Sequence, residues 1–339
     1  MQQDSSVDQI IVIGASSGGL EALRTLLEQL PADLDASVFI TMHIGDQPSL
    51  LPRLLATATS LDVDFALSGE KIKSGRIYVA PPDRHLLIKR GTIRLVRSAK
   101  ENHSRPAIDP MFRSAAISYG DRTTGVILTG ELDDGVVGLQ AIKAYGGMAF
   151  AQDPKTAEAP SMPASALRHV AVDVCLPLGE LGNALGRTIQ QRATEAPPAR
   201  TLNRIEPYAT EHDLTEDLSS GGAYALDAIG KVSGLSCPEC GGSLWELGAS
   251  PPRFRCHTGH GYTSTALLQA QSETIEEALW VAIRAMHEKQ LLLGRQIQNG
   301  RDSGRTSAVQ EYELVREGLE SHKETLRVLV TKLRPVSGS

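Results

Sequence analysis

The sequence predicts an α/β protein: a three-layer sandwich with a mostly parallel sheet and a β-hairpin, followed by two smaller C-terminal parts. Three observations predict this fold. Short β-branched runs alternate with helix-like stretches up to about residue 192. Several of the runs are almost continuously apolar, which is typical of strands that helices cover on both faces. The alternation stops at residue 193, where paired prolines and scattered charges begin.

Each element follows from its local pattern. Strands are expected at 10–13, 37–42, 75–80, 125–128, 148–151 and 170–175, and helices at 20–30, 49–58, 110–119 and 135–144. Two alternating runs flank Arg90-Gly91 within residues 86–96, and this pattern predicts the hairpin. The expected organisation is an α/β domain at 1–192, a linker at 193–222, a cysteine-bearing module at 223–263 and a helical hairpin at 264–335.

Composition excludes several classes of protein. The 339 residues are 41% hydrophobic and carry a formal net charge of -6, which gives no reason to expect a nucleic-acid partner. The N-terminal residues lack the basic and apolar regions of a secretory signal, and no apolar run has the length of a membrane span. Four cysteines are few for a disulfide framework. We therefore expect a cytoplasmic protein without membrane insertion.

A glycine-rich turn, Gly14-Ala15-Ser16-Ser17-Gly18-Gly19, follows the first expected strand. Such a turn holds either a dinucleotide phosphate or a nucleophilic serine. The dinucleotide interpretation lacks three companions: Leu20 replaces the third glycine, the second strand ends in histidine instead of an acid, and no tyrosine is followed four residues later by lysine. The context therefore disfavours a dinucleotide.

Three polar groups follow three expected strands. Ser16 follows the first, His43 the second, and Asp133-Asp134 the strand at 125–128. The carboxyl ends of parallel strands meet at one edge of a sheet, so these side chains can converge. Each has a structural alternative, since serine and aspartate often cap helices and His43 could be a buried core residue. Their joint placement favours a serine activated by a histidine and a carboxylate.

These residues together resemble the catalytic domain of the chemotaxis protein-glutamate methylesterase family. The resemblance rests on GASSGG (14–19), FITMH (39–43) and LTGELDDG (128–135), and on three further stretches at 78–88, 105–116 and 151–167. It implies a triad of Ser16, His43 and Asp134, with Asp133 in at most a capping role. The backbone N–H groups of Ser17 and Glu131 are the expected oxyanion donors.

The chain departs from the family pattern in two ways. The family usually has Gly-Met-Gly-Asn-Asp-Gly at the aspartate turn, where this chain has GELDDG, so that Glu131 and Leu132 replace residues near the expected oxyanion hole. Regulated members carry an N-terminal phosphoreceiver domain of about a hundred residues. Only residues 1–9 precede the first expected strand, so no receiver is expected in this sequence.

The resemblance implies hydrolysis of glutamate γ-methyl esters on a methylated chemoreceptor or related signalling protein, with release of methanol and no catalytic cofactor. Protein-glutamine deamidation is an open second activity. Two alternatives remain: a non-catalytic scaffold whose GELDDG turn has disabled the site, and an esterase or deamidase that acts on another substrate.

A metal-binding pattern lies in the cysteine-bearing module. Cys237-x2-Cys240 is followed by Cys256-His257 and His260, the spacing of a structural Zn²⁺ site in a zinc-ribbon-like module. We expect Cys237, Cys240, Cys256 and His260 as ligands, with His257 as the alternative fourth ligand. Cys175 is expected to be an ordinary buried thiol in a strand.

The last helix has an apolar seam at Tyr312, Val315, Leu319, His322, Leu326 and Leu329. Spacing of three and four residues suits packing on another helix, and a C-terminal helical pair is the simpler explanation. A partner that binds through this tail is the alternative. We also expect control of activity to lie in the C-terminal module, which would set access to Ser16.

Overall fold

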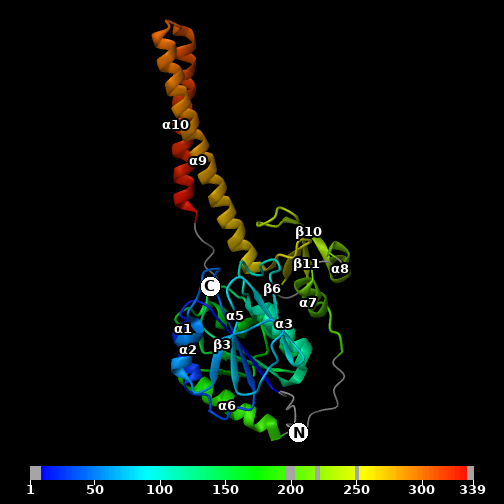
Figure 1. Cartoon of the computed structure of the whole chain (residues 1–339). Helices are drawn as coiled ribbons and strands as arrows, with labels where there is room; N and C mark the ends of the chain where they lie inside the picture. Colours follow the sequence, from blue (N-terminus) through cyan, green and yellow to red (C-terminus); the bar gives the residue numbers. More distant parts are fainter. Residues whose placement is uncertain (1–8, 195–202, 218–221, 249–251, 334–339) are drawn as a thin grey trace. The chain divides into compact units, whose positions relative to one another are not determined.

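The computed structural model describes residues 9–194, 203–217, 222–248 and 252–333 (Figure 1). The chain divides into two compact units, the first running to Leu267 and the second beginning at Leu268.

A seven-stranded parallel sheet forms the centre of the first unit, in the order β3-β4-β2-β1-β7-β8-β9. Its strands are β1 (Ile10–Ala15), β2 (Ser37–Met42), β3 (Asp62–Phe65), β4 (Arg76–Val79), β7 (Thr123–Ile127), β8 (Met148–Gln152) and β9 (Val174–Leu176). The expected hairpin is β5 (His85–Lys89) with β6 (Thr92–Val96). β1 lies in the middle of the sheet and all six of its residues are buried, so its carboxyl end opens at the centre of the sheet edge.

Helices cover both faces of this sheet. They are α1 (Gly19–Leu27), α2 (Leu51–Leu55), α3 (Ile108–Tyr119), α4 (Val136–Ala144), α5 (Ser161–His169) and α6 (Leu178–Thr194), with 3₁₀ turns at Ala56–Ala58, Gly120–Arg122 and Pro154–Thr156. One apolar core joins α1 and α6 to the sheet face that carries Ile11 and Ile13. A second core joins α3 and α4 to the opposite face, with Ile10 and Val12. Figure 1 shows α1 and α3 on opposite sides of the strands. The predicted three-layer α/β sandwich is confirmed.

Differences from the expected elements occur mainly at the edges of the sheet. β3, α5 and α6 were not expected, and the strand expected at 170–175 is the shorter β9. Cys175 was expected to be buried, but it is exposed, because β9 is an edge strand with one face toward solvent.

Two further helices, α7 (Tyr208–Glu216) and α8 (Gly222–Ile229), lie in and just after the stretch expected as a structureless linker. Part of that stretch, 195–202 and 218–221, is outside the described residues. The expectation is wrong for α7, because this helix buries polar groups. Glu211 pairs with Arg253 at 2.9 Å, and Thr215 accepts a hydrogen bond from Arg113 at 2.9 Å. A helix held by buried polar pairs shows no apolar period in the sequence.

An antiparallel sheet of four short strands follows, which we call the ribbon: β10 (Gly230–Ser236), β11 (Ser243–Leu247), β12 (Arg253–Cys256) and β13 (Gly261–Thr263). Its apolar cluster is small and consists of Leu214, Leu226, Trp245 and Leu247. A core of this size gives limited stability, which is why comparable modules depend on a metal ion.

A buried ionic contact holds the ribbon to the α/β domain. Glu101 pairs with Arg113 of α3 at 2.9 Å and with Arg255 of β12 at 2.7 Å, and all three side chains are at most 5% exposed. Burial would raise the pKa of Glu101, but the two guanidinium groups outweigh it and hold that pKa well below its ordinary value. Leaving one member of such a set unpaired typically costs about 3–5 kcal/mol, so these charges fix how the ribbon docks.

The second unit consists of most of α9 (Ser264–Asp302) and of α10 (Thr306–Lys332), a helical pair as predicted (Figure 1). The inward-facing stripe of α10 matches the predicted seam only in part. Tyr312, Leu319 and Leu326 are partly buried, whereas Val315, His322 and Leu329 are exposed. The buried residues of this helix are Val309 and Lys323. The Lys323 ammonium donates to Gln290 of α9 at 2.7 Å, which allows its aliphatic stem to lie in the seam.

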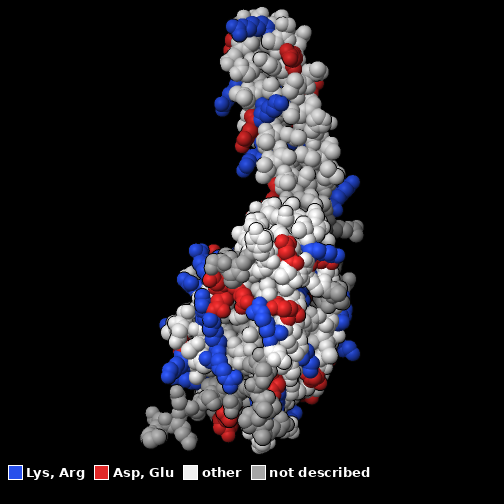
Figure 2. All heavy atoms as spheres, turned by 90° about the vertical axis from the view of Figure 1, so that its right-hand side faces the viewer, with Lys and Arg blue, Asp and Glu red and all other residues white. Residues whose placement is uncertain are grey.

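The surface matches the modest net charge of the chain. On the face in Figure 2, basic and acidic side chains are interspersed. Within the described ranges, no helix has both the length and the apolar character that crossing a bilayer would require.

Gly14 is needed for the close approach of α3 to β1. A Cβ at this position would lie 2.5 Å from Ile108 Cγ2. We expect Gly14→Ala to lower the free energy of unfolding by about 1–3 kcal/mol, the usual cost of overpacking, as measured by urea denaturation. Gly179→Ala is the control, since its added Cβ would have no atom within 4 Å apart from its chain neighbours and the backbone of its own helix. Equal effects of the two substitutions would contradict this explanation.

Candidate active site and metal centre

Ser16 lies at the carboxyl end of β1, in the turn that leads into α1. Its N–H donates to the Thr129 carbonyl at 3.0 Å, and its own carbonyl accepts from the Gly19 N–H at 2.8 Å. Gly18 has a φ of 72°, a left-handed conformation that favours glycine. The turn therefore reverses sharply and leaves Ser16 partly exposed at the sheet edge.

His43 connects Ser16 to Asp134. Its Nδ1 lies 3.1 Å from Ser16 Oγ, and its Nε2 lies 2.8 Å from Asp134 Oδ2. The three residues follow β1, β2 and β7, which are neighbours in the sheet. The structure thus brings together the three side chains that the sequence analysis singled out, in the order hydroxyl, imidazole, carboxylate.

The Asp134 carboxylate is buried and accepts four hydrogen bonds. Besides His43, its donors are the Ile108 N–H at 2.7 Å, the Asp109 N–H at 3.2 Å and the Asn102 amide at 2.9 Å. Burial alone would raise the pKa of Asp134. The hydrogen bonds and the charge of His43 outweigh burial, and the pKa lies below its ordinary value. Asp134 is therefore held as the carboxylate that orients His43.

A second buried carboxyl, Asp109, lies beside the first. Its Oδ1 accepts from the Gly138 N–H at 2.6 Å, and its Oδ2 accepts from the Asn102 amide at 2.9 Å. Burial and the nearby charge of Asp134 raise the pKa of Asp109 well above its ordinary value. Two buried carboxyls this close do not both ionise readily, so the negative charge resides on Asp134.

Of the two expected oxyanion donors, Ser17 is next to Ser16 in the chain and Glu131 is next to Gly130. Within the described chain, no hydrogen bond to another residue uses the N–H of Ser17 or of Glu131. Gly130 lies against the serine, since a Cβ there would be 2.9 Å from Ser16 Cβ. Leu132 has a φ of 61°, and its carbonyl accepts a hydrogen bond from Ser161 at 3.1 Å, which holds this strained turn in place.

Asp133, for which at most a capping role was expected, contacts the ribbon. The N-cap residue of α4 is Gly135, which has no side chain, and the Gly138 N–H in the first turn donates to Asp109. The buried Asp133 carboxylate instead accepts a hydrogen bond from Thr263 Oγ1 of the ribbon at 2.6 Å. This contact joins residues 130 positions apart.

A cleft of about 410 Å³ opens beside His43. Basic and acidic side chains both line it, including Arg97, Lys100 and Asp46. Its volume is within the usual range for small-molecule sites, and a polypeptide side chain could enter it.

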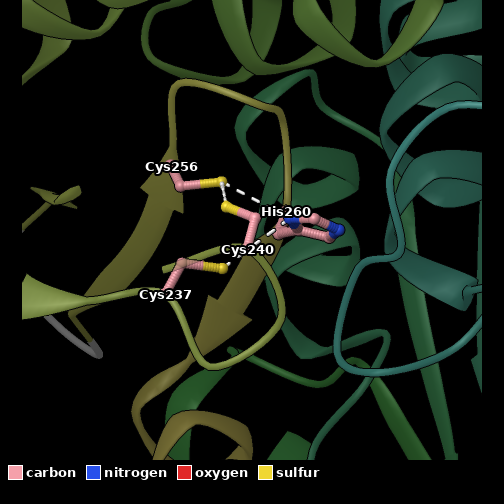
Figure 3. Close-up of side chains that lie close together, drawn as sticks. All are labelled: Cys237, Cys240, Cys256 and His260. Atoms are coloured by element: carbon pink, nitrogen blue, oxygen red, sulfur yellow. Dashed lines mark hydrogen bonds between the residues drawn. The ribbon is translucent and has the colours of Figure 1, made fainter. Parts of the chain in front are cut away.

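Cys237, Cys240, Cys256 and His260 form a compact cluster whose ligand atoms all lie within 4.8 Å of one another. Figure 3 shows the three sulfur atoms and the His260 ring directed toward a common centre. Cys240 Sγ and Cys256 Sγ are 3.7 Å apart, and Cys256 Sγ lies 3.5 Å from His260 Nδ1. Sulfurs in a tetrahedral zinc site are about 3.8 Å apart, given zinc–sulfur bonds of about 2.3 Å. The cluster therefore has the dimensions needed to hold a metal ion.

The neighbours of this cluster support the same conclusion. His260 Nε2 lies 3.2 Å from Glu239 Oε2, so a carboxylate orients the ring while Nδ1 faces the sulfurs. Burial raises the pKa of Cys256, but hydrogen bonds from His260 and Thr258 outweigh it and bring the pKa to about 6. His260 belongs to the cluster, and His257 does not.

The sequence analysis did not single out Asn102, Asp109, Thr263 or Glu239. Asp109 lies in the stretch 105–116 that carried part of the family resemblance, and Asn102 lies just before this stretch. No pattern in the sequence links Thr263 to the Asp133–Asp134 turn, because the contact forms only when the ribbon docks.

Comparison with known proteins gives a family match over the α/β domain. Residues 11–185 match the family described as CheB methylesterase. A putative protein-glutamate methylesterase/protein-glutamine glutaminase of Leptospira interrogans is 41% identical over 184 residues, which are 54% of this chain and 95% of that protein.

Two further proteins match about half of this chain. A protein-glutamate methylesterase/protein-glutamine glutaminase of Anaeromyxobacter dehalogenans is 40% identical over 178 residues, about half of each chain. The crystal structure of the Thermotoga maritima CheB methylesterase catalytic domain is 32% identical, with a TM-score of 0.49, and covers 54% of this chain and 98% of that chain.

The fourth ligand of the metal centre can be tested directly. We expect His260→Ala to lose tight metal binding, because it removes one donor of a four-ligand site. His257→Ala should retain binding. Titration of the full chain with Co²⁺, followed by its visible absorption, measures both variants. Loss of the tetrahedral spectrum in His257→Ala alone would contradict the assignment.

Proposed function

Because the chain belongs to the CheB methylesterase family, we propose that it hydrolyses glutamate γ-methyl esters on a chemoreceptor-type signalling protein and releases methanol. The observation that supports this most strongly is the hydrogen-bonded series from Ser16 through His43 to Asp134. The names of the relatives add protein-glutamine deamidation as a second activity, since a γ-amide can undergo the same acyl transfer.

In the proposed reaction, Ser16 Oγ attacks the ester carbonyl carbon while His43 Nδ1 takes the hydroxyl proton. The Nε2–H of His43 donates to Asp134, whose negative charge stabilises the imidazolium that forms. Collapse of the tetrahedral intermediate transfers that proton to the methoxy oxygen, and methanol leaves. Water then attacks the glutamyl-serine ester with His43 as general base, which yields the glutamate carboxylate and restores Ser16.

The oxyanion would bind the N–H groups of Ser17 and Glu131. Ser17 lies just before α1, where the helix dipole adds partial positive charge. The carbonyl oxygen would then point toward the turn at Gly130, and the glutamate side chain would enter through the cleft beside His43.

We propose a methylated chemoreceptor or related signalling protein as the partner, in the cytoplasm. Asp46, Arg97 and Lys100 line the cleft and offer both charge signs to a polypeptide that carries the ester. A reducing compartment also keeps the cluster cysteines available as metal ligands.

For the metal centre we propose structural Zn²⁺, held by Cys237, Cys240, Cys256 and His260. Three thiolates and one imidazole favour zinc and leave no open coordination position, so the ion would stabilise the ribbon and take no part in ester hydrolysis.

The nucleophile assignment predicts different results for two neighbouring serines. Ser16→Ala should lower kcat for methanol release from methylated receptor by about 10⁶-fold, since removal of a triad nucleophile typically has this effect. Ser17→Ala should have a mild effect, because only its backbone N–H is used. A fluorophosphonate should label Ser16. Labelling of Ser17, or methanol release that persists in Ser16→Ala, would contradict the proposal.

The two aspartates of the turn should also differ. Asp134→Asn should lower kcat by about 10³–10⁴-fold, because an amide favours the wrong tautomer of His43. Asp133→Asn should change kcat by less than about tenfold, since its amide oxygen can still accept from Thr263. Methanol release under saturating substrate measures both variants. A larger loss in Asp133→Asn would reverse the assignment.

A further inference from the structure

The ribbon reaches the triad through backbone pairing. The Gly261 N–H donates to the Lys100 carbonyl at 3.2 Å, and the Asn102 N–H donates to the Gly261 carbonyl at 2.8 Å. The loop 100–102 of the α/β domain therefore pairs with β13, the last strand of the ribbon sheet. This pairing places Asn102 between the ribbon and the carboxylate of Asp134.

The ribbon determines which way the Asn102 amide points. The Thr263 N–H donates to Asn102 Oδ1 at 2.9 Å, while the Asn102 amide donates to Asp134 Oδ1 and Asp109 Oδ2, both at 2.9 Å. A reversed amide would place its oxygen against two carboxyl groups and its nitrogen against an N–H. Thr263 thus favours the one orientation in which Asn102 stabilises the Asp134 carboxylate.

A second contact from the same residue reaches the other aspartate of the turn. Thr263 Oγ1 donates to Asp133 at 2.6 Å and accepts from the Ala266 N–H at 3.1 Å, at the start of α9. Thr263 is 2% exposed and Asp133 is 5% exposed. Without this hydroxyl, a buried carboxylate next to Asp134 would lose one of its hydrogen-bond donors.

The metal centre lies only three residues before Thr263. The Cys256 N–H donates to the His260 carbonyl at 3.0 Å, and the Tyr262 hydroxyl lies 3.3 Å from Cys237 Sγ. The residues of β13 that contact Asn102 and Asp133 are therefore held in place by the loops that carry the four ligands.

We propose that the ribbon positions the triad carboxylate, with Thr263 and Asn102 as positioning residues, so that loading of the metal centre controls the reactivity of Ser16. This inference rests on the proposed roles of Ser16, His43 and Asp134. In this proposal the C-terminal module regulates the reaction by changing how the Asp134 carboxylate is held.

The first experiment measures the rate at which a fluorophosphonate labels Ser16 in the full chain, which reports its nucleophilicity whatever the natural substrate. Asn102→Leu should slow labelling by about 10–100-fold, the usual effect of an outer partner of a functional group. Thr263→Val should slow labelling by up to about tenfold, because it removes the hydroxyl. Thr263→Ser keeps the hydroxyl and should be labelled at the wild-type rate. Ser264→Ala is the matched control, because the hydroxyl of this neighbouring residue donates to the Pro252 carbonyl, away from Asn102 and Asp133.

The pH profile of labelling separates positioning from a merely structural defect. The titratable groups around Asp134 are His43, Asp109, Asp133 and His85. The Asn102 amide helps to lower the pKa of Asp134. Its removal should raise that pKa and move the acid limb of the profile to higher pH. A slower rate with an unshifted acid limb would overturn the positioning role of Asn102.

The second experiment varies the metal in the full chain. Cys237→Ser should lower the bound zinc and slow the labelling of Ser16 together, whereas Cys175→Ser, which removes an exposed thiol outside the cluster, should change neither. Wild-type labelling and pH profile in zinc-free Cys237→Ser would overturn the inference. Failure of the proposed function would look different: zinc-dependent labelling of Ser16 without methanol release from methylated receptor.

Discussion

The buried carboxylate of Asp134 is the constraint on which the site depends. A charge removed from water must find hydrogen-bond donors, and Asp134 finds four: the ring of His43, the amide of Asn102 and the N–H groups of Ile108 and Asp109. These donors come from the end of β2, a loop and the first turn of α3. Burial and the proximity of Asp134 keep the proton on Asp109, so the pocket has to stabilise one negative charge and not two. The packing of α3 against the sheet places two of these donors, so the orientation of the His43 ring by Asp134 also depends on this packing.

Much of this arrangement could be predicted from the sequence. Apolar runs alternating with helices indicate parallel strands, and parallel strands have a common carboxyl edge, which is why Ser16, His43 and Asp134 could be grouped without a structure. The same reasoning missed α7, because its Glu211 and Thr215 are buried by charged and polar partners and leave no apolar stripe. It also gave Asp133 at most a capping role and left Thr263 unnoticed, because local patterns carry no information about how a separate module docks.

The contact between the ribbon and the α/β domain is made by charged side chains, although an apolar contact would avoid the cost of removing charges from water. Glu101 between Arg113 and Arg255 contributes little net stability relative to an apolar cluster of equal size, since the desolvation of three charges offsets their attraction. Such a set tolerates one register only, however, because any shift leaves a buried charge unpaired. The precision of this docking matters here because Thr263 lies at the end of β13 and donates to both Asn102 and Asp133.

The GELDDG turn need not mark a disabled site. Asp133 occupies the position where the resembling family usually has asparagine, and in this chain its carboxylate accepts the hydroxyl of Thr263. Leu132 stands where that family usually has glycine, and it adopts the left-handed φ that glycine would adopt, with Ser161 bonded to its carbonyl. Glu131 is exposed, so its charge remains solvated while its N–H is unpaired within the described chain. Leu132 thus gives the turn a left-handed residue and Asp133 forms a contact with the ribbon. These features favour an active site adapted to its C-terminal module over a scaffold that has lost its chemistry.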